Sequence, residues 1–316
     1  MKILVYLPSS DEAAAWLPSL ARTLPHADIR LWQPGDTDSA DYAIAWRPPR
    51  EFFTPRAQLK AVFTLSAGVD ALLALERHEP GTLPHGVPLV RLEDAGMATQ
   101  MAEYVTHAVL RYLRRFDEYE LAQRQAAPRW QPLEPHTRET FAVGVLGLGT
   151  LGAHVATTLA AFGFPVRGYS RGEKALDGVR TFAGPAHLDA FLDGLKVLVN
   201  LLPSTPSTDG ILNRHTFAKL ARGAYLVNVA RGAHLVEDDL FDALANGQLA
   251  AATLDVCAEE PLSPGHRLWH TPRVTITPHI SALTLREPSI AQIVAKIEAL
   301  SRGAPIKGIV DYTRGY

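Results

Sequence analysis

Three polar residues in the second half of the chain each follow an apolar run that is typical of a β-strand. Arg231 follows AYLVNVA, Glu260 lies in the loop after AATLDV, and His279 follows VTITP. An arginine binds a carboxylate or polarises a carbonyl, and a histidine donates a proton to a developing alkoxide. A carboxylate beside the histidine would orient its ring and keep it protonated. Such a set supports hydride transfer to a 2-oxo acid.

Each of these residues also has an ordinary structural alternative. His279 is one of 12 histidines, and most histidines in proteins have no chemical role. An arginine after a strand is often part of a surface ion pair, and a glutamate in a polar loop is usually solvated. Glu259 is a rival to Glu260, and the sequence E-P-L favours Glu260. The only cysteine, Cys257, is expected to be a small packed residue rather than a nucleophile.

A glycine motif precedes these residues. Gly147, Gly149 and Gly152 form G-x-G-x-x-G directly after the apolar run FAVGVL and before an alanine-rich helical pattern. In this context Gly147 permits a tight turn, Gly149 lets a pyrophosphate approach the backbone, and Gly152 lets the helix pack closely. The helix N-terminus offers N–H groups to the phosphates. The alternative is a tight strand-to-helix turn that binds no ligand.

The residues after the next strand bear on the choice of cofactor. A site for NAD has an acidic residue there for the ribose 2′-hydroxyl, but this chain has Ser170 and Arg171, with Lys174 nearby. A hydroxyl and a guanidinium suit a 2′-phosphate, so the sequence predicts NADPH over NADH. The alternative for Arg171 is a solvated loop arginine. Asp255, near the end of its strand, either helps to hold the nicotinamide carboxamide or caps a turn.

The elements that must position these residues alternate between strands and helices. In the first hundred residues we expect a helix at 11–24 and strands at 2–8, 27–32, 41–46, 61–66 and 88–92. A long helical pattern covers 102–125, and a proline-rich loop follows at 128–140. A second series of strands then runs from 141 to 279. Repeated strand–helix–strand units predict an α/β fold with parallel sheets.

The C-terminal pattern at 289–303 is helical again. We expect this helix and the one at 102–125 to cross between two domains, so that the smaller domain is built from both chain ends. The predicted boundaries give a substrate-binding domain at 1–100 plus 285–316 and a dinucleotide-binding domain at 101–284.

The composition narrows the class of protein. A chain of 316 residues with 47% hydrophobic and 20% charged residues is ordinary for a soluble two-domain protein. The net charge of −2 gives no electrostatic reason to expect nucleic acid or a membrane surface as partner. A single cysteine excludes an intrachain disulfide and a cysteine-based zinc site, and we expect no metal. MKILVYLPSS is expected to be a first strand and not a signal peptide, which indicates a cytoplasmic protein.

The motifs GLGTLG, LLPSTPST, YLVNVARG, TLDVCAEEPL and TPHISA occur in this order between residues 143 and 283. As a set they resemble the D-isomer-specific 2-hydroxyacid dehydrogenase family. AWRPP, LSAGVD, DAGMATQMAEYV, RRFDEYE and YTRGY extend the likeness over almost the whole chain, toward the NADP-dependent glyoxylate/hydroxypyruvate reductase branch. One departure is Cys257, where the family often has phenylalanine.

The resemblance implies two Rossmann-like domains with the active-site cleft between them, and a homodimer. It implies Arg231, Glu260 and His279 as the catalytic residues and Asp255 as a nicotinamide-binding residue. The substrate carboxylate would lie on backbone N–H groups of Ala67, Gly68 and Val69. Trp46 and Arg47 are candidates for the mouth of the substrate site, with packing in the small domain as the alternative for Trp46. The remaining cofactor contacts implied are Thr150 and Leu151 in the glycine loop, Leu202, Pro203, Ser204, Val229 and Ala230.

The sequence therefore predicts an NADPH-dependent reductase of glyoxylate and hydroxypyruvate, with a small 2-oxo or 2-hydroxy acid as its partner. One alternative is a reductase of larger 2-oxo acids, such as 2-ketogluconate or phenylpyruvate. The other is a dinucleotide-sensing, corepressor-like interaction protein, against which the lack of extra disordered tails counts.

Overall fold

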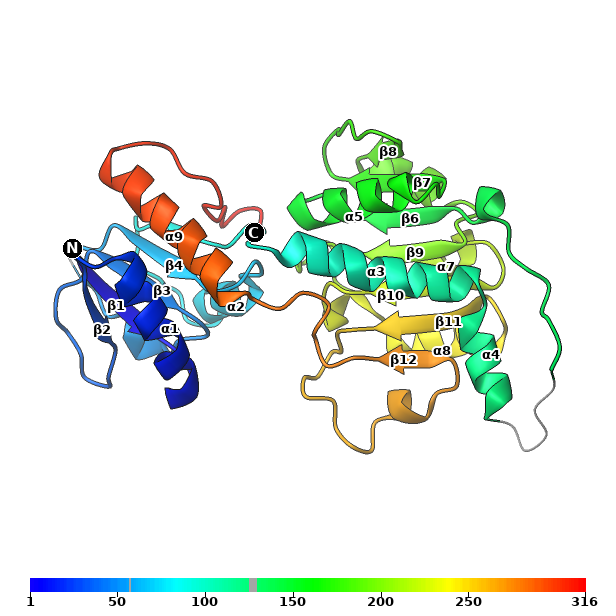
Figure 1. The fold of residues 1–316 in the computed structure, drawn as a ribbon, viewed down its shortest axis with the longest axis horizontal. Helices are drawn as coiled ribbons and strands as arrows, with labels where there is room; N and C mark the ends of the chain where they lie inside the picture. The colour runs from blue at the N-terminus through cyan, green and yellow to red at the C-terminus, as the bar shows by residue number, and fades with distance from the viewer. Residues whose placement is uncertain (57, 125–129) are drawn as a thin grey trace. The chain divides into compact units, whose positions relative to one another are not determined.

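The computed structural model describes residues 1–56, 58–124 and 130–316. They divide into two compact units, each with its own parallel sheet (Figure 1). The first unit comprises Met1–Gly96 and Thr284–Tyr316, and the second comprises Met97–Leu283. The α/β fold with two parallel sheets that the sequence predicts is confirmed. The binding roles predicted for the two domains stay predictions at this point.

The first unit contains a five-stranded sheet in the order β2-β1-β3-β4-β5. All neighbouring strands are parallel, and the order changes direction between β1 and β3. Loops after the strands on either side of such a change of direction are where open α/β sheets bind ligands. The elements are β1 (Lys2–Tyr6), α1 (Ser10–Thr23), β2 (Asp28–Leu31), β3 (Tyr42–Ala45), β4 (Ala61–Thr64), α2 (Asp70–His78), β5 (Leu89–Val90) and α9 (Arg286–Ser301), with a 3₁₀ helix at Arg50–Phe53.

The second unit contains a seven-stranded parallel sheet in the order β12-β11-β10-β9-β6-β7-β8. This is the doubly wound dinucleotide-binding order with one added strand, and its direction changes between β6 and β9. The strands are β6 (Val143–Leu146), β7 (Val166–Ser170), β8 (Val179–Ala183), β9 (Val197–Asn200), β10 (Ala224–Asn228), β11 (Leu249–Leu254) and β12 (Val274–Ile276).

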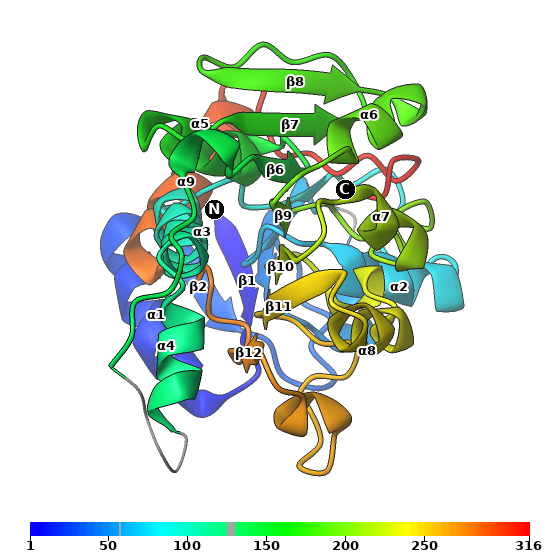
Figure 2. The ribbon, with the colours of Figure 1, turned by 90° about the vertical axis from the view of Figure 1, so that its right-hand side faces the viewer.

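Helices cover both faces of this sheet, with α3 and α5 on one side and α6, α7 and α8 on the other (Figure 2). Strands β6, β9 and β10 are buried along their whole length, as their continuous apolar runs predict. The helices are α3 (Met97–Leu113), α4 (Phe116–Gln123), α5 (Thr150–Ala161), α6 (Leu188–Leu192), α7 (Arg214–Lys219) and α8 (Glu237–Ala245), with 3₁₀ helices at Arg138–Thr140, Pro185–His187, Gly232–His234 and Arg267–His270.

The single long helix predicted at 102–125 is wrong, because the chain forms α3 and α4 with a break at Arg115. Arg115 has a left-handed φ of 55°, and its guanidinium donates to Glu118 at 2.7 Å and to the carbonyl oxygen of Glu134 at 2.7 Å. The expectation that two helices cross between domains is wrong as well, since α3 lies in the second unit and α9 in the first. Residue 125 and residues 128–129 of the predicted loop lie outside the described residues.

The sequence prediction also missed β8, which pairs with β7 at the edge of the second sheet. None of its five residues is fully buried, so the strand lacks the apolar signal of its neighbours. Within the described ranges, every helix is too short or too polar to cross a lipid bilayer.

Candidate active site

The carboxyl ends of five adjacent strands, from β12 to β6, carry most of the residues that the sequence singles out in the second unit. The glycine loop follows β6, Leu202–Ser204 follow β9, Arg231 follows β10, Glu260 follows β11 and His279 follows β12. Parallel strands end at the same edge of their sheet, so five loops meet there.

His279 lies just past β12 and has a left-handed φ of 57°. Its backbone N–H donates to the carbonyl oxygens of Asp255 at 2.8 Å and Thr277 at 3.0 Å. In its ring, Nδ1 is 2.8 Å from Glu260 Oε2. Because a carboxylate only accepts hydrogen bonds, Nδ1 carries a proton, and Nε2 is left to hold or release another. The side chain is 40% exposed.

Glu260 is held from its other oxygen. The N–H of Cys257 donates to Glu260 Oε1 at 3.1 Å, so the carboxylate spans its own loop and the His279 ring. Of the neighbouring pair, Glu260 is therefore the glutamate that contacts the imidazole, as the sequence pattern favours. A carboxylate fixed in this way orients the ring.

Asp255 is 1% exposed and organises the segment that carries His279. Its Oδ1 accepts from Thr277 Oγ1 at 2.5 Å and from the N–H of Ile280 at 2.8 Å, and its Oδ2 accepts from the N–H of Ser281 at 2.8 Å. Of the two roles that the sequence leaves open, capping a turn is the one seen here. Contact with a nicotinamide stays a prediction.

Arg231 lies on a loop that packs against the loop of Glu260. A Cβ on Gly232 would lie 1.9 Å from the backbone carbon of Cys257, so only glycine permits this approach. Arg231 Nη1 donates to the carbonyl oxygen of Ala230 at 2.7 Å, and the side-chain amide of Asn228 donates to the carbonyl oxygen of Arg231 at 3.0 Å. The guanidinium is half-buried at the strand edge.

A buried polar network that the sequence interpretation missed underlies this loop. Asn200 and Asn228 end β9 and β10 opposite each other in the sheet, and the side-chain amide of Asn200 donates to Asn228 Oδ1 at 3.0 Å. The same amide donates to Nδ1 of His234 at 2.8 Å, and all three residues are fully buried. The available signal was an asparagine at the same place in two apolar runs, KVLVN and AYLVN. This network ties the loop after β9 to that of Arg231.

The glycine loop has the shape that a pyrophosphate requires. Gly147 has a left-handed φ of 109°, and a Cβ on Gly152 would lie 1.8 Å from the carbonyl oxygen of Gly147. A Cβ on Gly149, by contrast, would meet no atom within 4 Å. Gly149 precedes α5, whose first N–H groups have no side-chain cap. The loop is therefore closed on the protein side and open at the helix N-terminus, so these residues fit a dinucleotide.

Alanine at Gly149 and at Gly152 should have opposite effects. Gly152→Ala is expected to lower the melting temperature by more than about 10 °C, since the methyl group overlaps a backbone oxygen. Gly149→Ala should melt within about 2 °C of wild type, because its Cβ meets only open space. Its methyl group should nevertheless raise the Kd for NADPH at least about tenfold by blocking the approach of a phosphate. Thermal denaturation and NADPH fluorescence titration measure the two effects, and unchanged NADPH binding by Gly149→Ala would contradict this placement.

The residues after β7 have the character that the sequence predicts for a 2′-phosphate site. Ser170 is the last residue of β7 and donates to the carbonyl oxygen of Gly172 at 2.7 Å. Arg171 and Lys174 follow with exposed side chains. Both are cations on the loop beside the glycine motif. They therefore suit the 2′-phosphate of NADPH better than the neutral ribose hydroxyls of NADH.

Arg171→Ala is expected to raise the KM for NADPH by about 10–100-fold, the usual value of a charge-assisted hydrogen bond, and the KM for NADH less than about twofold. Arg180→Ala is a matched control, because Arg180 is an exposed arginine on the adjacent strand that stacks on Phe182. Steady-state kinetics with both cofactors measures the ratio. If the ratio of the KM for NADPH to the KM for NADH is unchanged, Arg171 does not bind the 2′-phosphate.

The other predicted cofactor residues are less exposed. Leu202, Pro203 and Ser204 are partly buried, and the N–H of Leu202 donates to Asn200 Oδ1 at 3.2 Å. Val229 and Ala230 are buried, and the N–H of Ala230 donates to Asn228 Oδ1 at 3.3 Å. Their contacts with a cofactor stay predictions, as do those of Thr150 and Leu151 in the first turn of α5.

The predicted substrate residues belong to the first unit. Ala67, Gly68 and Val69 join β4 to α2, where Ser66 Oγ donates to the carbonyl oxygen of Gly68 at 2.6 Å. Trp46 and Arg47 follow β3, and Arg47 is exposed with a left-handed φ of 48°. Both loops lie at carboxyl ends of the first sheet. Substrate binding by these five residues stays a prediction.

Cys257 behaves as a packed thiol. Burial, together with the smaller contributions of the charges of Glu237, Glu260 and Asp255, raises its pKa to about 11. A thiol with this pKa is protonated at neutral pH, which is unsuited to a nucleophile. The described residues contain no group of three or more histidine, cysteine, aspartate or glutamate side chains that could hold a metal ion.

Comparison with known proteins adds to this geometry. The family model described as D-isomer specific 2-hydroxyacid dehydrogenase, NAD binding domain, matches residues 106–281. The glyoxylate/hydroxypyruvate reductase A of Serratia proteamaculans is 57% identical over 316 residues, and that of Yersinia enterocolitica is 56% identical over the same length. Each match covers 100% of both chains.

Two solved structures are similar over almost the whole chain. A D-isomer specific 2-hydroxyacid dehydrogenase from Xanthobacter autotrophicus, in complex with NADPH and MES, has a TM-score of 0.92 at 41% identity and 99% coverage of both chains. An NADPH-dependent glyoxylate/hydroxypyruvate reductase from Sinorhizobium meliloti, in complex with NADP and sulfate, has a TM-score of 0.90 at 36% identity, covering 100% of this chain and 99% of the other.

Proposed function

This chain belongs to the D-isomer specific 2-hydroxyacid dehydrogenase family, and we propose that it reduces glyoxylate to glycolate and hydroxypyruvate to D-glycerate with NADPH. The observation that carries the proposal is the 2.8 Å contact between His279 and Glu260, on the same sheet edge as Arg231 and the glycine loop. The relatives named above act on these two acids, and their identity extends over the full chain.

The cofactor would be held by the glycine loop and by the loop after β7. The N–H groups at the start of α5 would bind its pyrophosphate, and Arg171 with Lys174 would bind its 2′-phosphate. NADPH supplies the hydride when it is bound. Support comes from the two similar structures, which contain NADPH and NADP, and from the absence of an acidic residue at Ser170 and Arg171.

His279 would act as the general acid. As hydride reaches the carbonyl carbon of the 2-oxo acid, the carbonyl oxygen gains negative charge and needs a proton. Glu260 occupies Nδ1, so Nε2 is the nitrogen that would deliver the proton and complete the hydroxyl group. The carboxylate also fixes the orientation of the ring for this transfer.

Arg231 would bind the substrate and polarise its carbonyl. A guanidinium offers paired donors to the carboxylate or keto oxygen of a 2-oxo acid, and these bonds strengthen as the oxygen becomes negative. The hydrogen bond from Asn228 and the contact of Gly232 with the Cys257 loop would hold its backbone.

The direct test is the loss of NADPH absorbance with glyoxylate and with hydroxypyruvate, each repeated with NADH. Turnover with NADPH and either acid at a kcat/KM above about 10⁴ M⁻¹s⁻¹, an ordinary enzymatic value, supports the proposal. Turnover confined to 2-ketogluconate or phenylpyruvate would move the chain to a different substrate class. Tight NADPH binding without turnover of any of the four acids would favour a sensing role.

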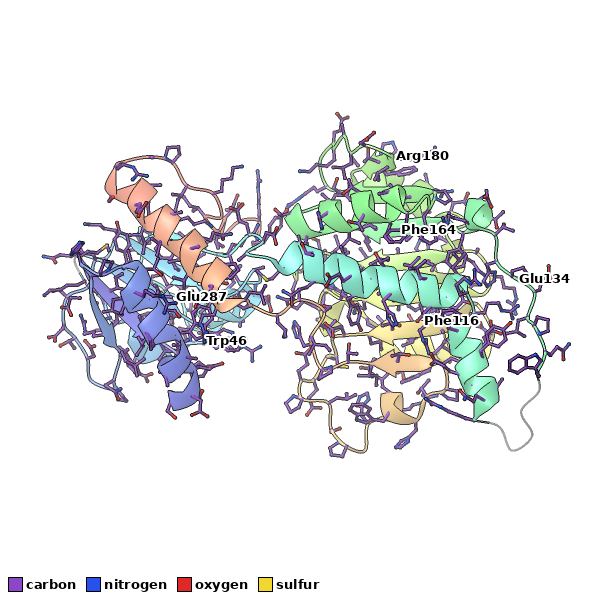
Figure 3. All side chains as sticks on the ribbon, viewed as in Figure 1. Trp46, Phe116, Glu134, Phe164, Arg180 and Glu287 are labelled. Carbon is purple, nitrogen blue, oxygen red and sulfur yellow. The ribbon has the colours of Figure 1, made fainter. Side chains whose placement is uncertain are left out.

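We further infer that two copies of this chain form a dimer through a surface on α4. Phe116 and Tyr119, here named the α4 surface, lie three positions apart on one side of the helix and are 50% and 39% exposed, and α4 has no buried residue. Phe116 is labelled in Figure 3. A helix with apolar residues exposed on this scale is typical of an interface.

Light scattering after gel filtration tests the dimer. Wild type should elute with twice the mass of one chain, and the double variant Phe116→Ser/Tyr119→Ser should elute with the mass of a single chain. Phe162→Ser is the control, since Phe162 is a similarly exposed phenylalanine at the end of α5. A monomeric wild type would contradict the dimer, and a dimeric double variant would exclude the α4 surface. The cytoplasmic location stays a prediction.

A further inference from the structure

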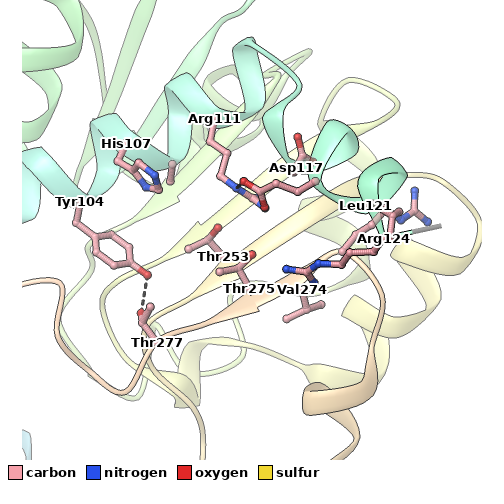
Figure 4. A pocket seen from close by; sticks show the side chains of 13 residues that line it. Tyr104, His107, Arg111, Asp117, Leu121, Arg124, Thr253, Val274, Thr275 and Thr277 are labelled. Carbon is pink, nitrogen blue, oxygen red and sulfur yellow. Dashed lines mark hydrogen bonds and ion pairs between the residues drawn. The ribbon is translucent and has the colours of Figure 1, made fainter. Parts of the chain in front are cut away.

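Two tyrosines of α3 make the same kind of hydrogen bond to threonines of the second sheet. Tyr104 Oη lies 2.6 Å from Thr277 Oγ1, and Tyr112 Oη lies 2.7 Å from Thr253 Oγ1. Tyr104 and Thr277 lie at one end of a cavity of about 490 Å³ between α3 and β12 (Figure 4). The two bonds differ in what the threonine contacts next.

The direction of the Tyr104 bond follows from the carboxylate beside it. Thr277 Oγ1 is also 2.5 Å from Asp255 Oδ1, and it has one proton to donate. An ionised carboxylate only accepts, so the threonine proton goes to Asp255 and the Tyr104 hydroxyl must donate to Thr277. Burial raises the pKa of Tyr104 to about 12, and the charge of Asp255 acts in the same direction, so this donor keeps its proton in any ordinary assay.

Asp255 passes this restraint to the segment that carries the general acid. Its carboxylate accepts the N–H groups of Ile280 and Ser281, and its carbonyl oxygen accepts the N–H of His279. His279 needs such restraints, because its left-handed φ is disfavoured for a side chain with a Cβ. A displaced carboxylate would therefore change the direction of the imidazole.

We propose that Tyr104 is a positioning residue, which fixes the His279 segment through Thr277 and Asp255. The proposal rests on the proposed function, in which His279 delivers the proton. Tyr112 gives the contrast within the same helix. Thr253 lies inside β11, and its hydroxyl contacts Tyr112 but no carboxylate among the described residues.

The experiment compares Tyr104→Phe with Tyr112→Phe, since each variant removes one hydroxyl from α3. Tyr104→Phe is expected to lower kcat about 5–20-fold with the KM for NADPH unchanged, the effect of losing one hydrogen bond in the transition state. The solvent deuterium isotope effect on kcat should rise, because proton delivery becomes slower. Tyr112→Phe should reduce thermal stability while kcat stays within about twofold.

Variants at the threonine complete the test. Thr277→Ser keeps the hydroxyl and should retain the wild-type kcat, whereas Thr277→Val should match Tyr104→Phe. The double variant Tyr104→Phe/Thr277→Val should be no slower than Thr277→Val alone, since both changes break one connection. Wild-type kcat in Tyr104→Phe, or an equal loss in Tyr112→Phe, would overturn the proposal.

A readout without substrate separates this proposal from the proposed function. Hydrogen exchange at the backbone amides of Ile280 and Ser281 should accelerate in Tyr104→Phe and stay at the wild-type rate in Tyr112→Phe. If wild type reduces no 2-oxo acid but the exchange rates differ as expected, the proposed function fails and the structural connection stands. Equal exchange rates in the two variants would overturn the connection itself.

Discussion

Replacement of His279 by alanine is expected to lower kcat for glyoxylate by about 10²–10⁴, the usual contribution of a positioned general acid. The ring is held at Nδ1 by Glu260, which leaves Nε2 to deliver the proton. The KM for NADPH should stay within about threefold, because three strands separate β12, which precedes His279, from β6 and the glycine loop that is expected to bind the cofactor. Steady-state kinetics with both substrates measures these values.

Glu260→Gln is a milder variant that tests the hydrogen-bond partner of His279. The amide oxygen can still accept from Nδ1, but a charge-assisted hydrogen bond becomes a weaker neutral one, so kcat should fall by about 10–100-fold. His270→Ala, at an exposed histidine shortly before β12, controls for the loss of an imidazole from the same region. A loss of less than tenfold in His279→Ala would place the proton donor elsewhere.

Replacement of Arg231 by alanine should damage both substrate binding and turnover. The guanidinium is proposed to bind the carboxylate of the 2-oxo acid and the developing alkoxide. The loss of two charge-assisted hydrogen bonds corresponds to a fall in kcat/KM of about 10²–10⁴-fold. We expect the KM for glyoxylate to rise and kcat to fall, with the KM for NADPH within about threefold. Kinetics at varied glyoxylate and saturating NADPH separates the two effects.

The structural alternative for Arg231 is testable in the same protein preparations. Its Nη1 donates to the carbonyl oxygen of Ala230, so the side chain also braces its own loop. Arg231→Lys keeps the charge but loses the paired donors, and it should recover only part of the activity. If the alanine variant loses protein yield or melting temperature while the folded fraction turns over normally, Arg231 is structural.

The sequence predicted those parts of the molecule that depend on local patterns. The glycine loop is recognisable because three glycines at fixed spacing stand between an apolar strand and a helix, and the structure gives each the surroundings that this spacing predicts. His279 and Glu260 are expected near each other because polar residues that follow parallel strands meet at one edge of the sheet, and their side chains are 2.8 Å apart.

The features that the sequence did not predict depend on distant contacts. The break between α3 and α4 depends on Arg115 donating to a carbonyl oxygen 19 residues away. The apolar periodicity through this region therefore does not indicate that the helix is broken. Tyr104 and Thr277 are separated by 173 positions, and neither stands in a motif that suggests the other. The Asn200–Asn228 pair required the register of β9 against β10, which a single strand pattern does not contain.

The protonated state of Cys257 has a practical consequence for attaching spectroscopic labels to this protein. With a pKa of about 11, only on the order of one thiol in a thousand is ionised at pH 8, and thiolates are the species that react with maleimides. Since the chain has no other cysteine, a new one placed on an exposed position of either unit would react far ahead of the native thiol. Fluorophores or spin labels could thus be attached at introduced cysteines without first replacing Cys257.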